Sequence, residues 1–327
     1  MIQPGKNASE GTVAEQRNIV RSPRPPERFR PSEEIREPTE EEMALLRDAE
    51  RFVDEALANL STVDILPFDR RRAYVFRDDA PGTGGRKSSH VSAFHHMGLL
   101  PLGSDRVPSR LTFLRHAIHE MVHAKSSNVT KIGSRTALIK LGFERHSLSL
   151  IDTNPAATSF QGFSEGVTVL IENSATTRAR NSEAYRDEFS RFAMEHASQL
   201  DQIEPYRRHL IYAFLHHEDG TDTALFGGYE FESETVALIV MGMREQEDVP
   251  LMDMFSRVVD AYRSGSFETI KKPIRDRFGP LAWKVLSQWK VGMGREEQNR
   301  LWDFFGATDP VERDRIAREI LEGSVSK

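Results

Sequence analysis

Residues His119, Glu120 and His123 form the motif H-E-x-x-H, which carries the clearest chemistry in the chain. On a helix, residues four positions apart lie on one face, with their Cβ atoms about 5–6 Å apart. Two imidazoles in this arrangement can bind one Zn²⁺ at about 2.0–2.1 Å. The glutamate beside the first histidine can then take a proton from a water on the metal. The motif therefore predicts a zinc site with Glu120 as general base.

The residues around the motif predict a helix with one apolar face. Apolar side chains recur there at helical spacing: Leu111, Leu114, Ile118, Met121 and Val122. No proline or glycine interrupts residues 109–127, and Pro108 and Ser109 suit a helix start. The alternative is a surface helix that carries two histidines by accident.

A catalytic zinc site needs a third protein ligand, and the chain has no cysteine to supply one. The position six residues past His123 is Val129, which excludes the metzincin arrangement. The remaining donors are Asp, Glu or a distant His. Our candidate is Glu165, because Ser164 can cap a helix that starts at Glu165, where the helix dipole favours a carboxylate. The alternative is a carboxylate that only caps the helix.

The segments H-E-M-V-H (119–123) and S-E-G-V-T (164–168) together resemble the gluzincin pattern. In that family, H-E-x-x-H is followed on the next long helix by N-E-[G/A]-x-T. Thr168 takes the place of the family's threonine, whereas Ser164 stands in place of its asparagine. The resemblance covers roughly residues 74–172, about a third of the chain.

The gluzincin resemblance implies a zinc metallopeptidase with Glu120 as general base. It also implies an edge strand, before the metal helix, that pairs with the backbone of an extended peptide or protein substrate. The zinc ligands that it implies are His119, His123 and Glu165.

Other side chains are candidates to serve the same reaction. A peptidase of this type needs a donor for the oxyanion, commonly Tyr or His, and Tyr229 is our first candidate and His217 our second. Glu172 lies seven positions after Glu165, on the same helix face. It is a candidate to orient a ligand histidine through that ring's second nitrogen, and the alternative is a plain surface carboxylate.

The pattern of elements predicts an α+β fold that is mostly α. Thr39 and Glu42 form a capping box before an apolar helical stripe, and strands are expected at 73–77, 90–96 and 99–102. A short loop-and-strand return should join the metal helix to the helix of Glu165. Beyond that helix the pattern predicts almost only further helices, at 182–198, 205–217, 229–243, 251–262, 267–278, 281–290 and 310–321.

Three regions are expected along the chain. Residues 1–38 are rich in proline and arginine and predict a disordered tail. Residues 39–175 should form a zincin-like sheet with the metal-binding helices, and residues 176–327 a helical subdomain that closes the cleft. The glycine-containing segments 82–88 and 220–227 are interpreted as loops, because their spacing fits neither a phosphate-binding loop nor an aspzincin site.

Composition limits the classes of partner. A net charge of −6 gives no basic footprint for nucleic acid. The chain has neither an apolar run long enough for a bilayer nor an apolar signal segment, and it has no cysteine, so we expect a cytoplasmic protein. Its oligomeric state stays open.

The rival hypothesis is a non-catalytic helical binding module with a structural or degenerate zinc site. Glu120 favours the enzyme, because a structural site needs no glutamate beside its ligands. A weaker rival is a zinc hydrolase that acts on a non-peptide amide.

Overall fold

The computed structural model describes most of the chain between residues 35 and 323. The described ranges are 35–36, 38–65, 67–68, 73–76, 100–102, 110–132, 136–149, 157–203, 211–216, 222–226 and 229–323. The helices are α2 (Glu40–Leu60), α4 (Arg110–Ala124), α5 (Gln161–Asn181), α6 (Arg186–Glu195), α7 (Ala197–Leu200), α8 (Glu230–Glu247), α9 (Leu251–Ser264), α10 (Glu268–Phe278), α11 (Ala282–Gln288), α12 (Arg295–Gly306) and α13 (Pro310–Gly323). The strands are β1 (Ile35–Arg36), β2 (Ala73–Phe76), β3 (Leu100–Leu102), β4 (Asn128–Ile132), β5 (Thr136–Leu141), β6 (Glu144–Ser149), β7 (Ala157–Ser159), β8 (Ile211–His216) and β9 (Asp222–Phe226).

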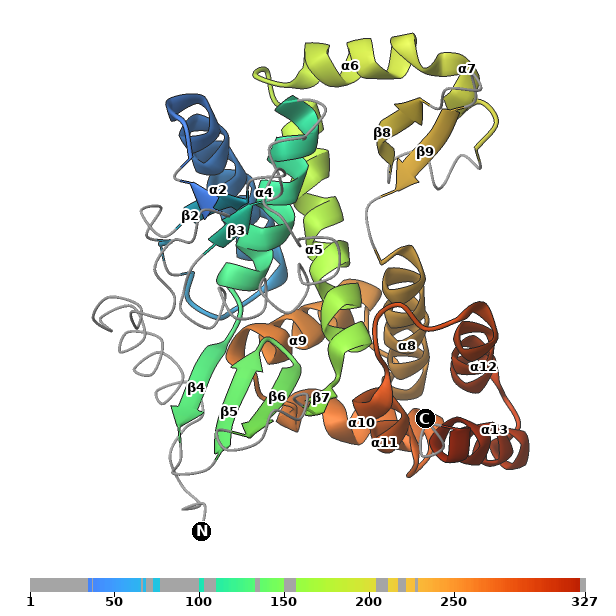
Figure 1. Ribbon diagram of the computed structural model, residues 1–327. Coiled ribbons are helices and arrows are strands. Elements are labelled where there is room, and N and C mark those ends of the chain that lie inside the picture. Colours follow the sequence, from blue (N-terminus) through green and yellow to red (C-terminus); the bar gives the residue numbers. More distant parts are fainter. Residues whose placement is uncertain are drawn as a thin grey trace.

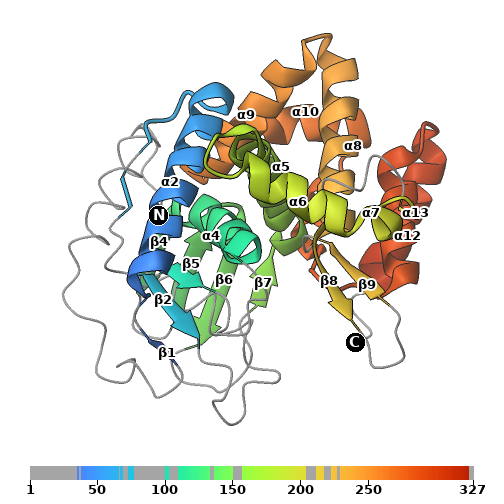
Figure 2. The ribbon, with the colours of Figure 1, turned by 90° about the horizontal axis from the view of Figure 1, so that it is seen from above.

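Helix α5 is the central element of the molecule. It packs against α2, α4, α8 and α9, which surround it in Figures 1 and 2. The faces that meet are largely apolar, and their side chains such as Phe52, Ile118, Phe163 and Val236 are fully or almost fully buried. This packing fixes α4 and α5 side by side, which is what a site shared between them requires.

Helix α2 begins where the sequence predicts. The backbone amide of Thr39 donates to the carboxylate of Glu42 over 2.7 Å, and the amide of Glu42 donates to the hydroxyl of Thr39 over 3.3 Å. These two bonds form the expected capping box, which satisfies donors that the first turn leaves without helical partners.

The strands form three small sheets, so the fold is α+β and mostly α, as predicted. One sheet has the order β1-β2-β3, the second is the antiparallel series β4-β5-β6-β7, and the third pairs β8 with β9. The second sheet lies in the chain between α4 and α5 (Figure 1). The prediction of only a short loop-and-strand return at that place was therefore wrong.

Two further departures occur in the second half of the chain. The predicted helix at 205–217 and the predicted loop at 220–227 contain the antiparallel pair β8 and β9, with Ile211 opposite Phe226. The segment I-Y-A-F-L-H is rich in residues that favour strands, and the pairing partner decides its conformation. Helix α12 was not predicted, because its first two turns, R-E-E-Q-N-R, carry no apolar side chain.

The predicted three-region division remains a prediction. Its boundary after residue 175 falls inside α5, which continues to Asn181. In the predicted tail, Ile35 and Arg36 pair with β2. Apart from these two residues and Pro38, the tail lies outside the described residues, as do the expected strand at 90–96 and the segment 82–88. No helix in the described part is both long and apolar enough to cross a bilayer.

Candidate metal centre

The three predicted metal ligands come together between α4 and α5. His119 and His123 lie one turn apart on α4, and Glu165 faces them from α5; one nitrogen or oxygen of each lies within 4.8 Å of the others. The Oε2 atom of Glu165 is 3.5 Å from Nε2 of His119 and 3.2 Å from Nε2 of His123. Metal–ligand bonds of about 2.0–2.2 Å in a tetrahedron place the ligand atoms about 3.4 Å apart. The trio therefore fits a divalent metal ion in both donor type and spacing.

The position of Glu165 depends on where helix α5 begins, which differs from the sequence prediction. Helix α5 begins at Gln161, so Ser164 lies inside the helix and caps nothing, and Glu165 is more than a turn from the start. The amide of Gly162 donates to the carbonyl of Trp289 over 3.0 Å, and a Cβ on Gly162 would lie 2.2 Å from the indole nitrogen. A tertiary contact thus sets the start of α5, and the predicted capping and dipole argument for Glu165 was wrong.

Glu172 contacts His119 at Nδ1, the ring nitrogen that does not face Glu165. Its Oε2 atom lies 2.9 Å from Nδ1 of His119, and its Oε1 atom accepts a hydrogen bond of 2.6 Å from Nε of Arg115. Glu172 is buried, which excludes the surface alternative. With Nδ1 occupied by Glu172, Nε2 of His119 is the nitrogen that faces Glu165.

The electrostatics of the pocket favour a cation. Burial lowers the pKa of His119, but the hydrogen bonds to Glu165 and Glu172 outweigh it and raise the pKa well above its usual value. Burial also lowers the pKa of His123, and the charge of Glu165 more than reverses this effect. A pocket that stabilises protons on both rings also stabilises a metal ion, which brings positive charge to the same nitrogens.

Glu120 and Tyr229 both lie beside the trio. Glu120 is partly exposed on α4, and its charge contributes to the raised pKa of both ligand histidines and of Tyr229. The ring of Tyr229 stacks on that of His119, with ring centroids 5.8 Å apart and an angle of 28° between the planes. The predicted alternative donor, His217, lies outside the described residues.

Tyr229 is held in an unusual backbone conformation at the start of α8. Its φ of 70° is left-handed, which costs a residue other than glycine of order 1 kcal/mol or more and is common at functional sites. The charge of Glu165, followed by burial, raises the pKa of the phenol. The phenol therefore keeps its proton at neutral pH and can donate a hydrogen bond into the site.

Tyr262, on α9, was not among the predicted site residues. Its hydroxyl lies 2.8 Å from Oγ1 of Thr168 and 3.3 Å from Nδ1 of His123. Tyr262 is 139 positions from His123 and belongs to no motif, so only its place on the buried face of α9 could have drawn attention to it.

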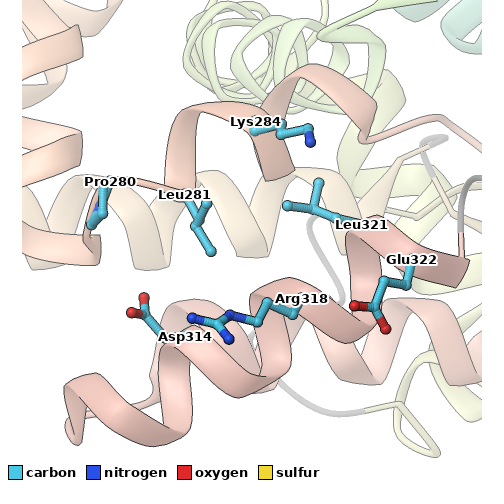
Figure 3. A pocket seen from close by; sticks show the side chains of 7 residues that line it. All are labelled: Pro280, Leu281, Lys284, Asp314, Arg318, Leu321 and Glu322. Carbon is cyan, nitrogen blue, oxygen red and sulfur yellow. The ribbon is translucent and has the colours of Figure 1, made fainter.

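A separate hollow lies among the C-terminal helices. It has a volume of about 650 Å³ between α11 and α13, and Figure 3 shows apolar side chains beside charges of both signs. Its lining residues are Pro280, Leu281, Lys284, Asp314, Arg318, Leu321 and Glu322. This mixture defines no ligand class, and none of the trio contributes to it.

Comparison of the chain with protein-family models, with curated proteins and with solved structures finds no match. The chemistry of the site therefore has to be argued from its own residues. Two imidazoles and a carboxylate can hold a metal ion, and a carboxylate that is not one of these ligands, Glu120, can move a proton beside it.

Proposed function

We propose that this protein is a zinc-dependent metallopeptidase in which Glu120 is the general base. The observation that carries the proposal is the gathering of His119, His123 and Glu165 at metal-ligand spacing, with Glu120 next to the first ligand. Zinc is the metal proposed, because two imidazoles with one carboxylate are a donor set of catalytic zinc sites. The substrate proposed is a peptide or protein, in keeping with the gluzincin resemblance.

Each side chain has a definite part in this proposal. Zinc on the trio would supply a Lewis acid that polarises a carbonyl and makes water more acidic. Glu120 accepts the proton of the attacking water and passes it to the leaving amine. Tyr229, stacked on His119 and protonated, donates a hydrogen bond to the carbonyl oxygen as that oxygen gains charge.

The donor count favours a catalytic site over a structural one. A structural zinc site is closed by four protein ligands, whereas a catalytic site has three and keeps a position open. Among the described residues, the candidate group contains three donors. Glu120 has a clear use only in the catalytic case.

The test is to compare the wild type with Glu120→Gln for zinc content and for hydrolysis of a peptide library. Glu120→Gln should keep zinc, because it removes no ligand, and should lose roughly 10²–10⁴-fold in rate because the base is gone. An unchanged rate would contradict the role of Glu120. A wild type that binds zinc yet cleaves no peptide would support the non-catalytic zinc module instead.

A further inference from the structure

Tyr262 is a buried tyrosine whose ring is fixed on several sides. Gly142, in the turn between β5 and β6, has a φ of 54°, and a Cβ there would lie 2.3 Å from Cε2 of Tyr262. The ring of Phe143 meets the Tyr262 ring edge-on, with centroids 5.5 Å apart. The turn therefore closes directly onto the ring, so the position of the hydroxyl is fixed as well.

Counting donors supports one arrangement of the hydrogen atoms around this hydroxyl. Thr168 donates its single hydroxyl hydrogen to the carbonyl of Ser164 over 3.0 Å. Ser126, which also lies against the Tyr262 hydroxyl, donates its own to the carbonyl of His123 over 2.7 Å. In this arrangement both hydroxyls present lone pairs to Tyr262, and the phenol donates its hydrogen to the oxygen of Thr168, which at 2.8 Å is closer than Nδ1 of His123 at 3.3 Å.

This arrangement sets the direction of the remaining contact, between Tyr262 and Nδ1 of His123. Tyr262 has one hydrogen, which goes to Thr168, so its contact of 3.3 Å with Nδ1 of His123 requires a hydrogen on that nitrogen. A neutral imidazole with its hydrogen on Nδ1 has a lone pair on Nε2. Nε2 is the atom that lies 3.2 Å from Glu165.

We propose that Tyr262 and Thr168 are positioning residues for His123, which hold its Nδ1–H form so that Nε2 presents its lone pair to the metal ion. This inference rests on the metal site of the proposed function. It gives the two ligand histidines different supports: a carboxylate, Glu172, for His119, and a chain of neutral hydroxyls for His123. Such partners of a ligand's second nitrogen fix its tautomer and orientation.

Two substitutions test the chain because each removes one link without touching a ligand. Tyr262→Phe keeps the ring and removes the acceptor of the Nδ1 hydrogen, so zinc affinity should fall within the range of roughly 10–100-fold that such partners contribute. In Thr168→Val the phenol loses this acceptor, and its hydrogen is left with the oxygen of Ser126 and Nδ1 of His123 as acceptors. Donation to Nδ1 favours the wrong tautomer, so zinc affinity should fall although Thr168 acts on His123 only through Tyr262.

The double variant separates a connected chain from independent packing effects. In Tyr262→Phe/Thr168→Val, zinc affinity should be no lower than in Tyr262→Phe alone, because the second link acts only through the first. The matched control is Tyr185→Phe, since Tyr185 is also fully buried but hydrogen-bonds to Asp48, over 2.5 Å. The control should lower stability, leaving zinc affinity and the absorption bands of the cobalt-substituted protein unchanged, whereas Tyr262→Phe should shift both.

Zinc affinity is measured by competition with a chelating dye on proteins shown to be folded. Wild-type affinity in Tyr262→Phe, or additive losses in the double variant, would overturn this inference and leave the zinc site standing. Absence of zinc binding in the wild type would overturn both this inference and the proposed function.

Discussion

Glu172 is the residue that most directly sets the orientation of the His119 ring towards the metal site. Its carboxylate bonds to Nδ1 of His119 with one oxygen and to Arg115 with the other. Burial raises the pKa of Glu172, but the Arg115 guanidinium and the His119 ring outweigh it and lower the pKa to about 2. A charged, fully engaged carboxylate is thus held inside the molecule, where it fixes the ring and stabilises the fold.

This arrangement predicts a dependence of stability on acid. Because the folded pKa of about 2 lies below the ordinary 4.5, the folded state binds fewer protons than the unfolded state between these values. The stabilisation by Glu172 is therefore complete above the ordinary pKa and is lost as pH falls towards the folded one. Denaturant unfolding of the metal-free protein should show a steeper loss of free energy across this window in the wild type than in Glu172→Gln. Equal slopes would show that Glu172 is not the group responsible.

Substitution of Tyr229 should change the catalytic rate without changing metal binding. Tyr229→Phe keeps the ring that stacks on His119 and removes only the donor, so kcat should fall roughly 10²–10³-fold. Zinc content should stay at the wild-type level. The control is Tyr185→Phe, because Tyr185 is a buried tyrosine whose hydroxyl donates to Asp48, and this variant should leave kcat unchanged. A kcat in Tyr229→Phe equal to that of the wild type would remove Tyr229 from the reaction.

For the single residues of the metal centre, the sequence indicates most of the arrangement. The spacing of His119, Glu120 and His123 on one helix predicts a shared face, and the spacing from Glu165 to Glu172 predicts a second one, because helical periodicity is local. The contact of Tyr262 with His123 spans 139 positions and depends on how α9 packs, so no local pattern could predict it.

Among the elements, the contact of α5 with α8 is the one that brings Tyr229 to the ligands. It depends on Gly166, next to Glu165, because a Cβ there would lie 2.4 Å from the backbone oxygen of Glu232 and 2.5 Å from Cγ2 of Val236. The absence of a side chain on Gly166 thus lets the first turns of α8 lie directly against the helix that carries the third ligand.

Gly166→Ala should therefore destabilise the protein. Alanine gains about 1 kcal/mol in helix propensity, but a Cβ pressed against a backbone oxygen costs typically 1–3 kcal/mol, and the backbone of α8 cannot turn aside as a side chain can. The matched control is Gly306→Ala, at the exposed end of α12, where a Cβ meets nothing within 4 Å. Thermal unfolding of the two variants compares them, and equal melting temperatures would contradict tight packing at Gly166.

The elements that the sequence predicts are those with a complete local signal. Helix α2 has both its capping box and its apolar stripe, and α9 and α10 have strong stripes. The start of helix α12 is polar and therefore carries no apolar stripe. The strands β8 and β9 form because they pair with each other. The start of α5 depends on the packing of Gly162 against Trp289, which is a tertiary contact.

Over the whole molecule, the candidate centre is assembled from two pairs of helices, α4 with α5 and α8 with α9, and the two pairs are far apart in the chain. Helices α4 and α5 carry the trio, α8 carries Tyr229 at its start, and α9 carries Tyr262 (Figure 1). The four-stranded sheet follows the motif helix in the chain. The edge strand that the resemblance implies, before the metal helix, remains a prediction.

The most direct measurement is the zinc content of purified protein, stripped with a chelator and reloaded, in the wild type and in His119→Ala, His123→Ala and Glu165→Ala. The control is His146→Ala, because His146 is a second buried histidine paired with a glutamate, Glu144, over 2.8 Å and is not one of the trio. We expect about one zinc per chain in the wild type and in the control, and loss of zinc in the other three variants, since catalytic zinc needs all three protein ligands. Zinc-free wild type, or full zinc occupancy in Glu165→Ala, would contradict it.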